Sequence, residues 1–179
     1  MDEKKLEDVK PGDSLPSLDF VYRVALQSER DLDESGNHIP RLKCFSLSPA
    51  DIEANYKLSV DWEKKTTPEE VLIRWGTSFK RGKNTEYKPF DNRVLYKLNV
   101  GFLQKLPFIL DVIYSPSHKN NAHSSICFDN EQFNYKEHEP EFLTELRDHA
   151  KQFIIKMNMD EVRKKVEEKR KAVLNNYAE

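Results

Sequence analysis

The chain has 179 residues, 37% hydrophobic and 34% charged, so we expect one ordinary domain with a modest core and a heavily solvated surface. Its 29 basic and 31 acidic residues leave a net charge of -2, which excludes a surface that binds nucleic acid over its whole area. No run approaches the roughly 20 apolar residues of a membrane span, and the charged N-terminus is no signal peptide, so we expect a cytoplasmic protein without membrane contact.

The chain begins with a predicted polar arm, residues 1–19, that contains little core material. Phe20–Gln27 follows, and its β-branched and aromatic residues predict a strand. After a charged connection in which Ser35–Asn37 favours a turn, Arg41–Leu47 predicts a second strand. Cys44 and Cys127 stand in apolar runs typical of buried thiols, and a disulfide between them stays open.

Two helix starts are marked by serine or threonine followed three residues later by an acid, with proline at the first helical position. The first, at Ser48, predicts one or two turns. The second, at Thr67, predicts a helix over Pro68–Trp75 that Gly76 ends and whose inward face holds Val71, Leu72 and Trp75. Between them, "KLSVDW" predicts a short extended segment.

The second half holds most of the predicted core. Alternation at Val94, Tyr96 and Leu98 predicts a strand, and Asn99 is a candidate cap for a short helix after it. The apolar run Phe108–Tyr114 predicts a central strand. The next strand begins near His123, with "SPSHKNNA" as the connection.

Apolar residues from Phe142 to Met157 recur at helical spacing, which predicts a helix that ends at Asn158, with Asp160 capping another. The last helix has a thin apolar stripe amid charge. Its residues are candidates for binding a protein partner or a second copy, although packing on the chain's own domain is an equal alternative: Val162, Val166, Val173 and Tyr177.

These elements predict an α+β fold. Its domain covers residues 20–134, with a small mixed sheet and short flanking helices, and a C-terminal helical extension covers residues 135–179.

His123-Ser124-Ser125 fits half of a two-histidine phosphoesterase pattern, in which imidazoles move protons and hydroxyls hold phosphate oxygens. In that reaction His123 would act as general acid or base, with Ser125 and Asn120 binding phosphate. No other histidine has a hydroxyl two positions on, so the pattern lacks its second half. We favour the interpretation that these polar residues satisfy backbone groups around a tight connection.

Other chemical constellations are weaker. His118 and His123 define no metal geometry, and we expect neither a metal nor a cofactor. Among the acids near the Thr67 helix start, Asp61 is the one we expect to be partly shielded. A basic loop offers phosphate contacts and a stacking ring, which makes a nucleic-acid-binding accessory protein an alternative: Lys80, Arg81, Lys83, Tyr87 and Lys88.

The ordered series "LSVDW", "TTPEEVL" and "NNAHSSI" resembles a family of small bacterial proteins with L-S-V-[DN], T-T-P-E-E and N-x-A-H-[AS]-x-[IV] motifs and no assigned activity. The likeness spans about residues 41–128. It implies an accessory gene beside a larger one, in phage-defence or mobile-element clusters. The matching residues are Leu58, Ser59, Val60, Asp61, Thr66, Thr67, Pro68, Glu69, Glu70, Asn120 or Asn121, Ala122, His123, Ser124 and Ile126.

Because the chain shows no complete catalytic set and its last helix has little apolar surface, we predict a non-catalytic interaction subunit that works with a larger bacterial protein. Two alternatives remain. One is a small hydrolase or nuclease that uses His123, and the other is the nucleic-acid-binding accessory protein.

Overall fold

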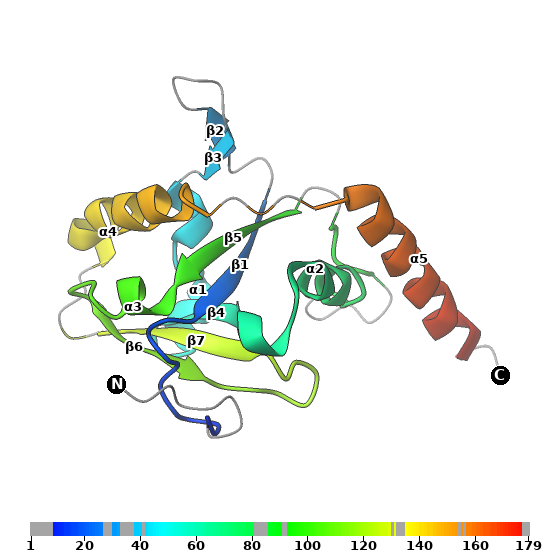
Figure 1. The fold of residues 1–179 in the computed structure, drawn as a ribbon, viewed down its shortest axis with the longest axis horizontal. Coiled ribbons are helices and arrows are strands. Elements are labelled where there is room, and N and C mark those ends of the chain that lie inside the picture. The colour runs from blue at the N-terminus through cyan, green and yellow to red at the C-terminus, as the bar shows by residue number, and fades with distance from the viewer. Residues whose placement is uncertain are drawn as a thin grey trace.

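The computed structural model describes residues 9–26, 30–32, 38–40, 42–80, 86–90, 93–129, 131, 135–153, 155 and 157–176. Its centre is a five-stranded sheet of order β5-β1-β4-β7-β6, and a separate two-stranded sheet pairs β2 with β3 (Figure 1). Every ladder between the described strands is antiparallel. The predicted α+β class is confirmed, with an antiparallel rather than mixed sheet. The strands are β1 (Phe20–Leu26), β2 (Arg30–Leu32), β3 (His38–Pro40), β4 (Lys57–Trp62), β5 (Arg93–Asn99), β6 (Ile109–Tyr114) and β7 (His123–Phe128).

Short and long helices join these strands. Both predicted capping boxes are confirmed: the Ser48 side chain accepts from the Asp51 amide, and the Thr67 side chain accepts from the Glu70 amide. Asn99 caps the short helix α3 through a 2.9 Å hydrogen bond from the Phe102 amide. The α-helices are α1 (Pro49–Glu53), α2 (Pro68–Gly76), α3 (Val100–Leu103), α4 (Tyr135–Ala150) and α5 (Met159–Asn176); the 3-10 turns are η3 (Leu42–Phe45) and η4 (Glu63–Lys65).

Two clusters of buried apolar residues hold the fold together. The larger cluster joins the sheet to η3 and α4, and the smaller joins it to α2 and α5. Figure 1 shows α4 and the α2–α5 pair on opposite sides of β1 and β5. The smaller cluster contains Tyr22, Val71, Leu72, Ile73, Phe90, Leu95, Val162 and Val166.

The N-terminal segment contributes more than a polar arm. Val9 and Leu15 are buried in the larger cluster. The Gly12 amide donates to the Tyr114 carbonyl at 2.8 Å, and the Leu15 amide donates to the Val112 carbonyl at 2.8 Å, so this segment lies along β6. Among the described strands β6 is the last of the five-stranded sheet rather than a central one, and its Leu110 is 63% exposed.

The strand predicted over Arg41–Leu47 is wrong, because residues 42–45 form η3. Cys44 and Phe45 are both buried, whereas neighbours in a strand point to opposite faces of the sheet. A tight helical turn sends both side chains into the larger cluster. Cys44 and Cys127 are buried free thiols, so no disulfide joins them.

The C-terminal helices differ from the expected boundaries. The first ends at Ala150, although apolar spacing continues, and Phe153 beyond its end packs its ring 5.0 Å from that of Phe20. Asn158 does not end this helix but caps α5, since its side-chain oxygen accepts from the Asp160 amide at 3.2 Å and from the Glu161 amide at 3.4 Å.

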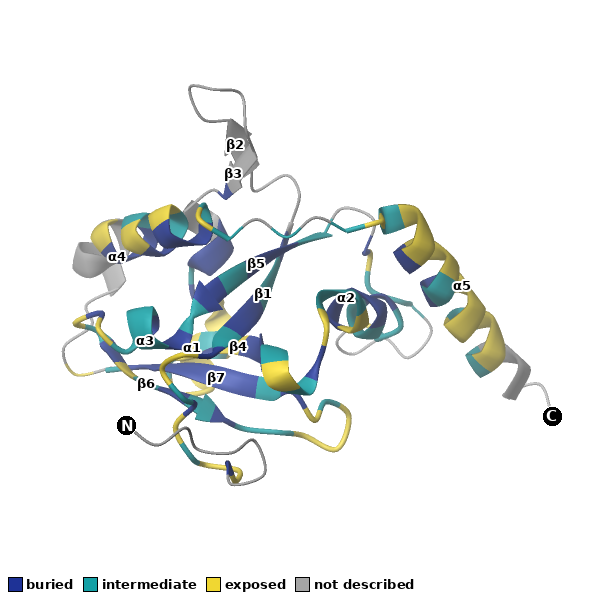
Figure 2. Ribbon diagram, in the orientation of Figure 1, coloured by how far each residue is buried: buried dark blue, intermediate teal, exposed yellow. Residues whose placement is uncertain are grey.

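The apolar stripe of α5 lies on the chain's own domain. Val162 and Val166 are buried in the smaller cluster, so these two partner-binding candidates contact α2 rather than a free surface (Figure 2). Val173 is half-buried, and Tyr177 lies outside the described residues. Gly76 serves this contact, because a Cβ there would lie 3.0 Å from Phe90 Cγ and from both methyl carbons of Val166. Within the described parts of the chain, no helix has the length and apolar character needed to cross a membrane.

Candidate functional site

The sheet opens between two of its strands. β1 and β4 pair only at Val21–Trp62 and Tyr22–Asp61, whereas β4 pairs with β7 along its length from Lys57 to Asp61. Beyond the last pair, the Arg23 guanidinium donates to the Ser59 carbonyl at 2.9 Å, in the place of a strand-to-strand hydrogen bond. The opening is therefore bridged by a cationic side chain.

A cavity of about 290 Å³ lies at this opening, with α2 over it. This volume suits a small ligand or one group of a larger one. The ionisable side chains of its lining, apart from Tyr22, are four cations, one carboxylate and one imidazole: Arg23, Arg74, Lys88, Lys119, Asp61 and His123. Because the whole chain carries a net charge of -2, this cationic lining contrasts with the rest of the protein.

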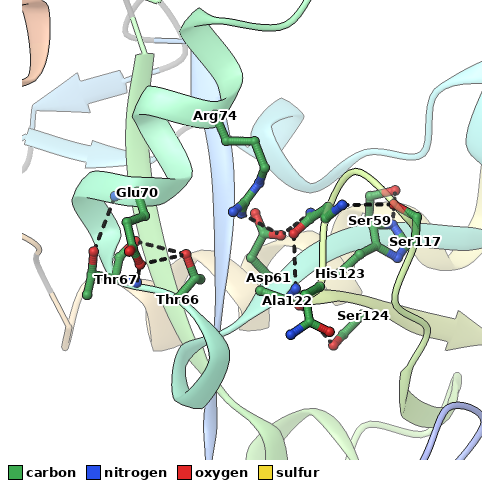
Figure 3. A network of polar contacts seen from close by, with 12 residues as sticks. Ser59, Asp61, Thr66, Thr67, Glu70, Arg74, Ser117, Ala122, His123 and Ser124 are labelled. Atoms are coloured by element: carbon green, nitrogen blue, oxygen red, sulfur yellow. Dashed lines mark hydrogen bonds and ion pairs between the residues drawn. The ribbon is translucent and has the colours of Figure 1, made fainter. Parts of the chain in front are cut away.

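Asp61 organises one wall of the pocket. Its carboxylate forms an ion pair with Arg74 at 3.0 Å and accepts a 2.6 Å hydrogen bond from the Asn120 side-chain amide (Figure 3). The Asn120 side-chain oxygen in turn accepts from the Ala122 amide at 3.1 Å. Asp61 is 9% exposed, which confirms the expected shielding. The carboxylate thus holds α2 and the loop before β7 in fixed positions.

The start of α2 determines where Arg74 lies. The Glu70 carboxylate accepts from the Thr67 amide at 2.8 Å and from the Thr66 hydroxyl at 3.3 Å. These contacts, above all the one with the Thr67 amide, lower the pKa of Glu70, so the capping carboxylate stays ionised. Figure 3 shows Arg74 pointing from this helix to Asp61.

His123 has one nitrogen fixed by the protein and one turned to the pocket. Its Nδ1 lies 2.8 Å from the Ser115 carbonyl oxygen. A carbonyl can only accept, so Nδ1 carries the hydrogen and the neutral ring has its lone pair on Nε2. That Nε2 lies 3.4 Å from Ser59 Oγ. The imidazole therefore presents a proton acceptor at the pocket.

The predicted phosphate-binding residues separate. Asn120 lines the pocket, but Ser125 is buried and is not part of the lining. The Ser125 hydroxyl lies 2.9 Å from the Ser115 hydroxyl, which also lies 3.0 Å from His123 Nδ1. Ser125 therefore helps to hold the imidazole in place, and its position outside the lining does not support the predicted contact with phosphate.

Sequence reasoning did not select Ser59, Arg23 or Arg74 as site residues. The alternation of "LSVDW" contained part of the signal, because Ser59 and Asp61 are two residues apart and share one face of β4. The two arginines come from β1 and α2, and no local pattern indicates that they meet.

The predicted nucleic-acid residues that the structure describes differ in their surroundings. Lys80 makes a 2.8 Å ion pair with Glu86. The Tyr87 ring stacks on Phe79 with centroids 4.7 Å apart, and the Arg170 guanidinium lies 4.6 Å from the same ring, so Tyr87 is already in contact within the protein. Arg81 and Lys83 lie outside the described residues.

Lys88 belongs to the pocket. Its ammonium lies 4.3 Å from the centroid of the Trp75 ring. Burial, together with the charge of Arg93, lowers the pKa of Lys88. Among the described residues, no carboxylate lies within ion-pair distance of Lys88 or Lys119. An anionic ligand would relieve this accumulation of positive charge.

Within the described ranges, no group of three or more histidine, cysteine or acidic side chains has an arrangement that could hold a metal ion. His118 is exposed and does not line the pocket with His123.

Comparison with family models, with curated proteins and with solved structures finds no match to this chain. The motifs of the family resemblance do meet at the pocket: Asp61 of "LSVDW" is the register partner of His123, and the helix that starts at "TTPEE" supplies Arg74. The membership itself stays a prediction. So does the interaction subunit, although its argument from an unburied last helix does not hold for Val162 and Val166.

Proposed function

We propose that the protein hydrolyses a phosphate ester in the pocket beneath α2, with His123 as the group that moves the proton. The observation that carries the proposal is the imidazole Nε2 facing a cavity lined by four cations and one carboxylate. Cations favour an anionic substrate and stabilise the charge that develops on phosphoryl oxygens in the transition state.

The tautomer of His123 suits this role. Because Nδ1 donates to the Ser115 carbonyl, Nε2 accepts a proton from the attacking nucleophile and then delivers it to the leaving oxygen. Asp61 does not share this work, since Arg74 and Asn120 occupy its carboxylate. Its role is to hold the cationic wall in position.

The cations divide by their surroundings. Lys88 is half-buried beside Trp75, where an anion is poorly shielded by water and its attraction is strong. Lys119 is exposed on the loop before β7 and suits the initial attraction of an anion from solution. A substrate group that fits the cavity therefore places its phosphate between the sheet opening and this loop.

The test uses the full chain with p-nitrophenyl phosphate and bis(p-nitrophenyl) phosphate, which separate monoester from diester hydrolysis. His123→Asn keeps an N–H donor for the Ser115 carbonyl but removes the base, and we expect it to lower turnover by about 100-fold or more. His118→Gln, in the loop before β7 and outside the lining, is the matched control and retains the rate. Turnover of neither ester, or equal rates for His123→Asn and wild type, overturns the proposal.

A further inference from the structure

The position of Ser59 on β4 places its hydroxyl in the pocket. Leu58 and Val60 on either side of it are buried, so the alternation of the strand leaves the Ser59 side chain exposed. The ladder from β1 ends before this residue, and its carbonyl is held by Arg23 at 2.9 Å. The hydroxyl is thus accessible from the opening and lies on a backbone that a cation fixes.

The register of β4 and β7 brings this hydroxyl to the imidazole. Ser59 pairs with Ser125, and Asp61 pairs with His123, so Ser59 and His123 are diagonal neighbours on adjacent strands. Ser59 Oγ lies 3.4 Å from His123 Nε2. This is the long end of a hydrogen bond, and contacts between a nucleophile and its base are often loose before a substrate binds.

Three groups therefore stand in series: a hydroxyl, an imidazole and the carbonyl that orients the imidazole. Because Nδ1–H is engaged with the Ser115 carbonyl, the hydroxyl of Ser59 donates to the lone pair of Nε2. A nucleophile, a base and an orienting acceptor in hydrogen-bonded order are the arrangement that activates a serine. Arg23, bonded to the same residue, supplies positive charge beside the hydroxyl.

We infer that Ser59 is the nucleophile and that the reaction passes through a phosphoserine at this position. This inference rests on the proposed function. The bond from Ser59 Oγ to phosphorus forms, and the hydroxyl proton moves to His123 Nε2. The bond from phosphorus to the leaving oxygen breaks, and that oxygen takes the proton from Nε2. Water then attacks phosphorus and gives a proton to Nε2, which returns it to Ser59 Oγ as phosphate leaves.

The competing arrangement has a water molecule as the nucleophile, with Ser59 only orienting it. Both arrangements need His123, and only the covalent route needs the Ser59 oxygen. Ser59→Ala removes one exposed atom whose sole recorded side-chain partner among the described residues is His123, so folding is expected to survive. Ser59→Cys restores a nucleophile at the same position and serves as the second variant.

Two measurements decide between them. With the chromogenic esters, Ser59→Ala is expected to lower turnover as far as His123→Asn does, about 100-fold or more. Ser46→Ala, which changes a serine outside the lining, keeps the wild-type rate. In parallel, a fluorophosphonate probe forms a bond to Ser59 Oγ with loss of fluoride, and peptide mass spectrometry locates it. We expect labelling at Ser59 that is lost in His123→Asn.

The outcomes separate the two proposals. If His123→Asn loses activity while Ser59→Ala keeps it, water is the nucleophile and the inference fails while the proposed function stands. If neither variant loses activity, both fail. If no ester is hydrolysed, the proposed function fails, and the probe alone tests whether Ser59 is a nucleophile. Labelling of Ser59 that depends on His123 then supports an activated serine, and the absence of labelling overturns it.

Discussion

The indole nitrogen of Trp62 donates a 2.9 Å hydrogen bond to the carboxylate of Asp19, and both side chains are buried. The other oxygen of that carboxylate forms a 2.8 Å ion pair with Lys64. A buried donor left without an acceptor loses its hydration and gains nothing in exchange. This pair therefore fixes the residues before β1 against the end of β4.

Replacing Asp19 by alanine leaves the Trp62 indole without this acceptor. We expect the free energy of unfolding to fall by about 1–3 kcal/mol, measured by urea denaturation. Lys64→Ala is the comparison variant, because it removes the ion pair and leaves the indole contact in place, and we expect a smaller loss from it. Equal losses in the two variants would show that the ion pair, rather than the indole contact, stabilises the fold.

Gly76→Ala sets two effects against each other. Alanine gains about 1 kcal/mol of helix propensity over glycine. However, the new methyl group would lie 3.0 Å from the buried side chains of Phe90 and Val166, and such overpacking costs about 1–3 kcal/mol. We expect a net loss in guanidinium denaturation. In a Val166→Ala background the contact with Phe90 remains but those with the Val166 methyl groups are removed, so the same substitution is expected to cost less than in the wild type. Destabilisation of similar size in both backgrounds contradicts this account.

His149 makes stability depend on pH. Its Nε2 accepts from the Asn99 amide at 3.1 Å, its ring stacks on Phe102, and burial lowers the pKa of His149 below its usual 6.5. The folded state prefers the neutral ring, so its contribution is present above pH 6.5 and is lost as the pH falls through the lower folded-state pKa.

Urea denaturation at about pH 8 and about pH 5 tests this dependence around the pKa of histidine. His149→Gln keeps an acceptor for the Asn99 amide but does not titrate. We therefore expect this variant to lose less unfolding free energy on acidification than the wild type does. His118→Gln, on the exposed loop before β7, is the control and is expected to keep the pH dependence of the wild type. The account is contradicted if the free energy of unfolding changes between the two pH values by the same amount in the wild type and in His149→Gln.

Arg170 on α5 ties two segments together. It donates to the Gly76 carbonyl at 2.9 and 2.6 Å and to the Lys88 carbonyl at 3.0 Å. Lysine lacks the planar fork for both acceptors. We expect Arg170→Lys to lower stability by about 1–3 kcal/mol and to speed amide hydrogen exchange over residues 86–90. Lys169→Ala, on an exposed neighbour, serves as the control, and unchanged exchange in Arg170→Lys counts against the tie.

Local patterns predicted the elements that local chemistry determines. The capping boxes at Ser48 and Thr67 satisfy amides within three residues, so their sequence is sufficient to place α1 and α2. By contrast, residues 42–45 form a turn because Cys44 and Phe45 both enter the core, which only the assembled sheet provides. Likewise, the apolar run in β6 predicted a central strand, but its composition does not determine whether a strand lies on one side of it or on both.

The site divides in the same way. The polar loop before β7 and the acid in "LSVDW" were visible in the sequence, and the structure makes Asp61 and His123 register partners. The pocket itself exists because β1 leaves β4 after Tyr22, and Arg74 reaches it from a helix elsewhere in the chain. Such meetings depend on the path of the strands rather than on spacing along the sequence.

The segment from Gly12 to Leu15 forms backbone hydrogen bonds with β6, which lies about a hundred residues later in the chain. During synthesis this segment leaves the ribosome long before its partner, and the contact closes a large loop. This contact therefore cannot form before β6 has been synthesised. Until the contact forms, the outer edge of β6 stands open to a strand from another nascent chain, so a segment made early protects an edge that is made much later.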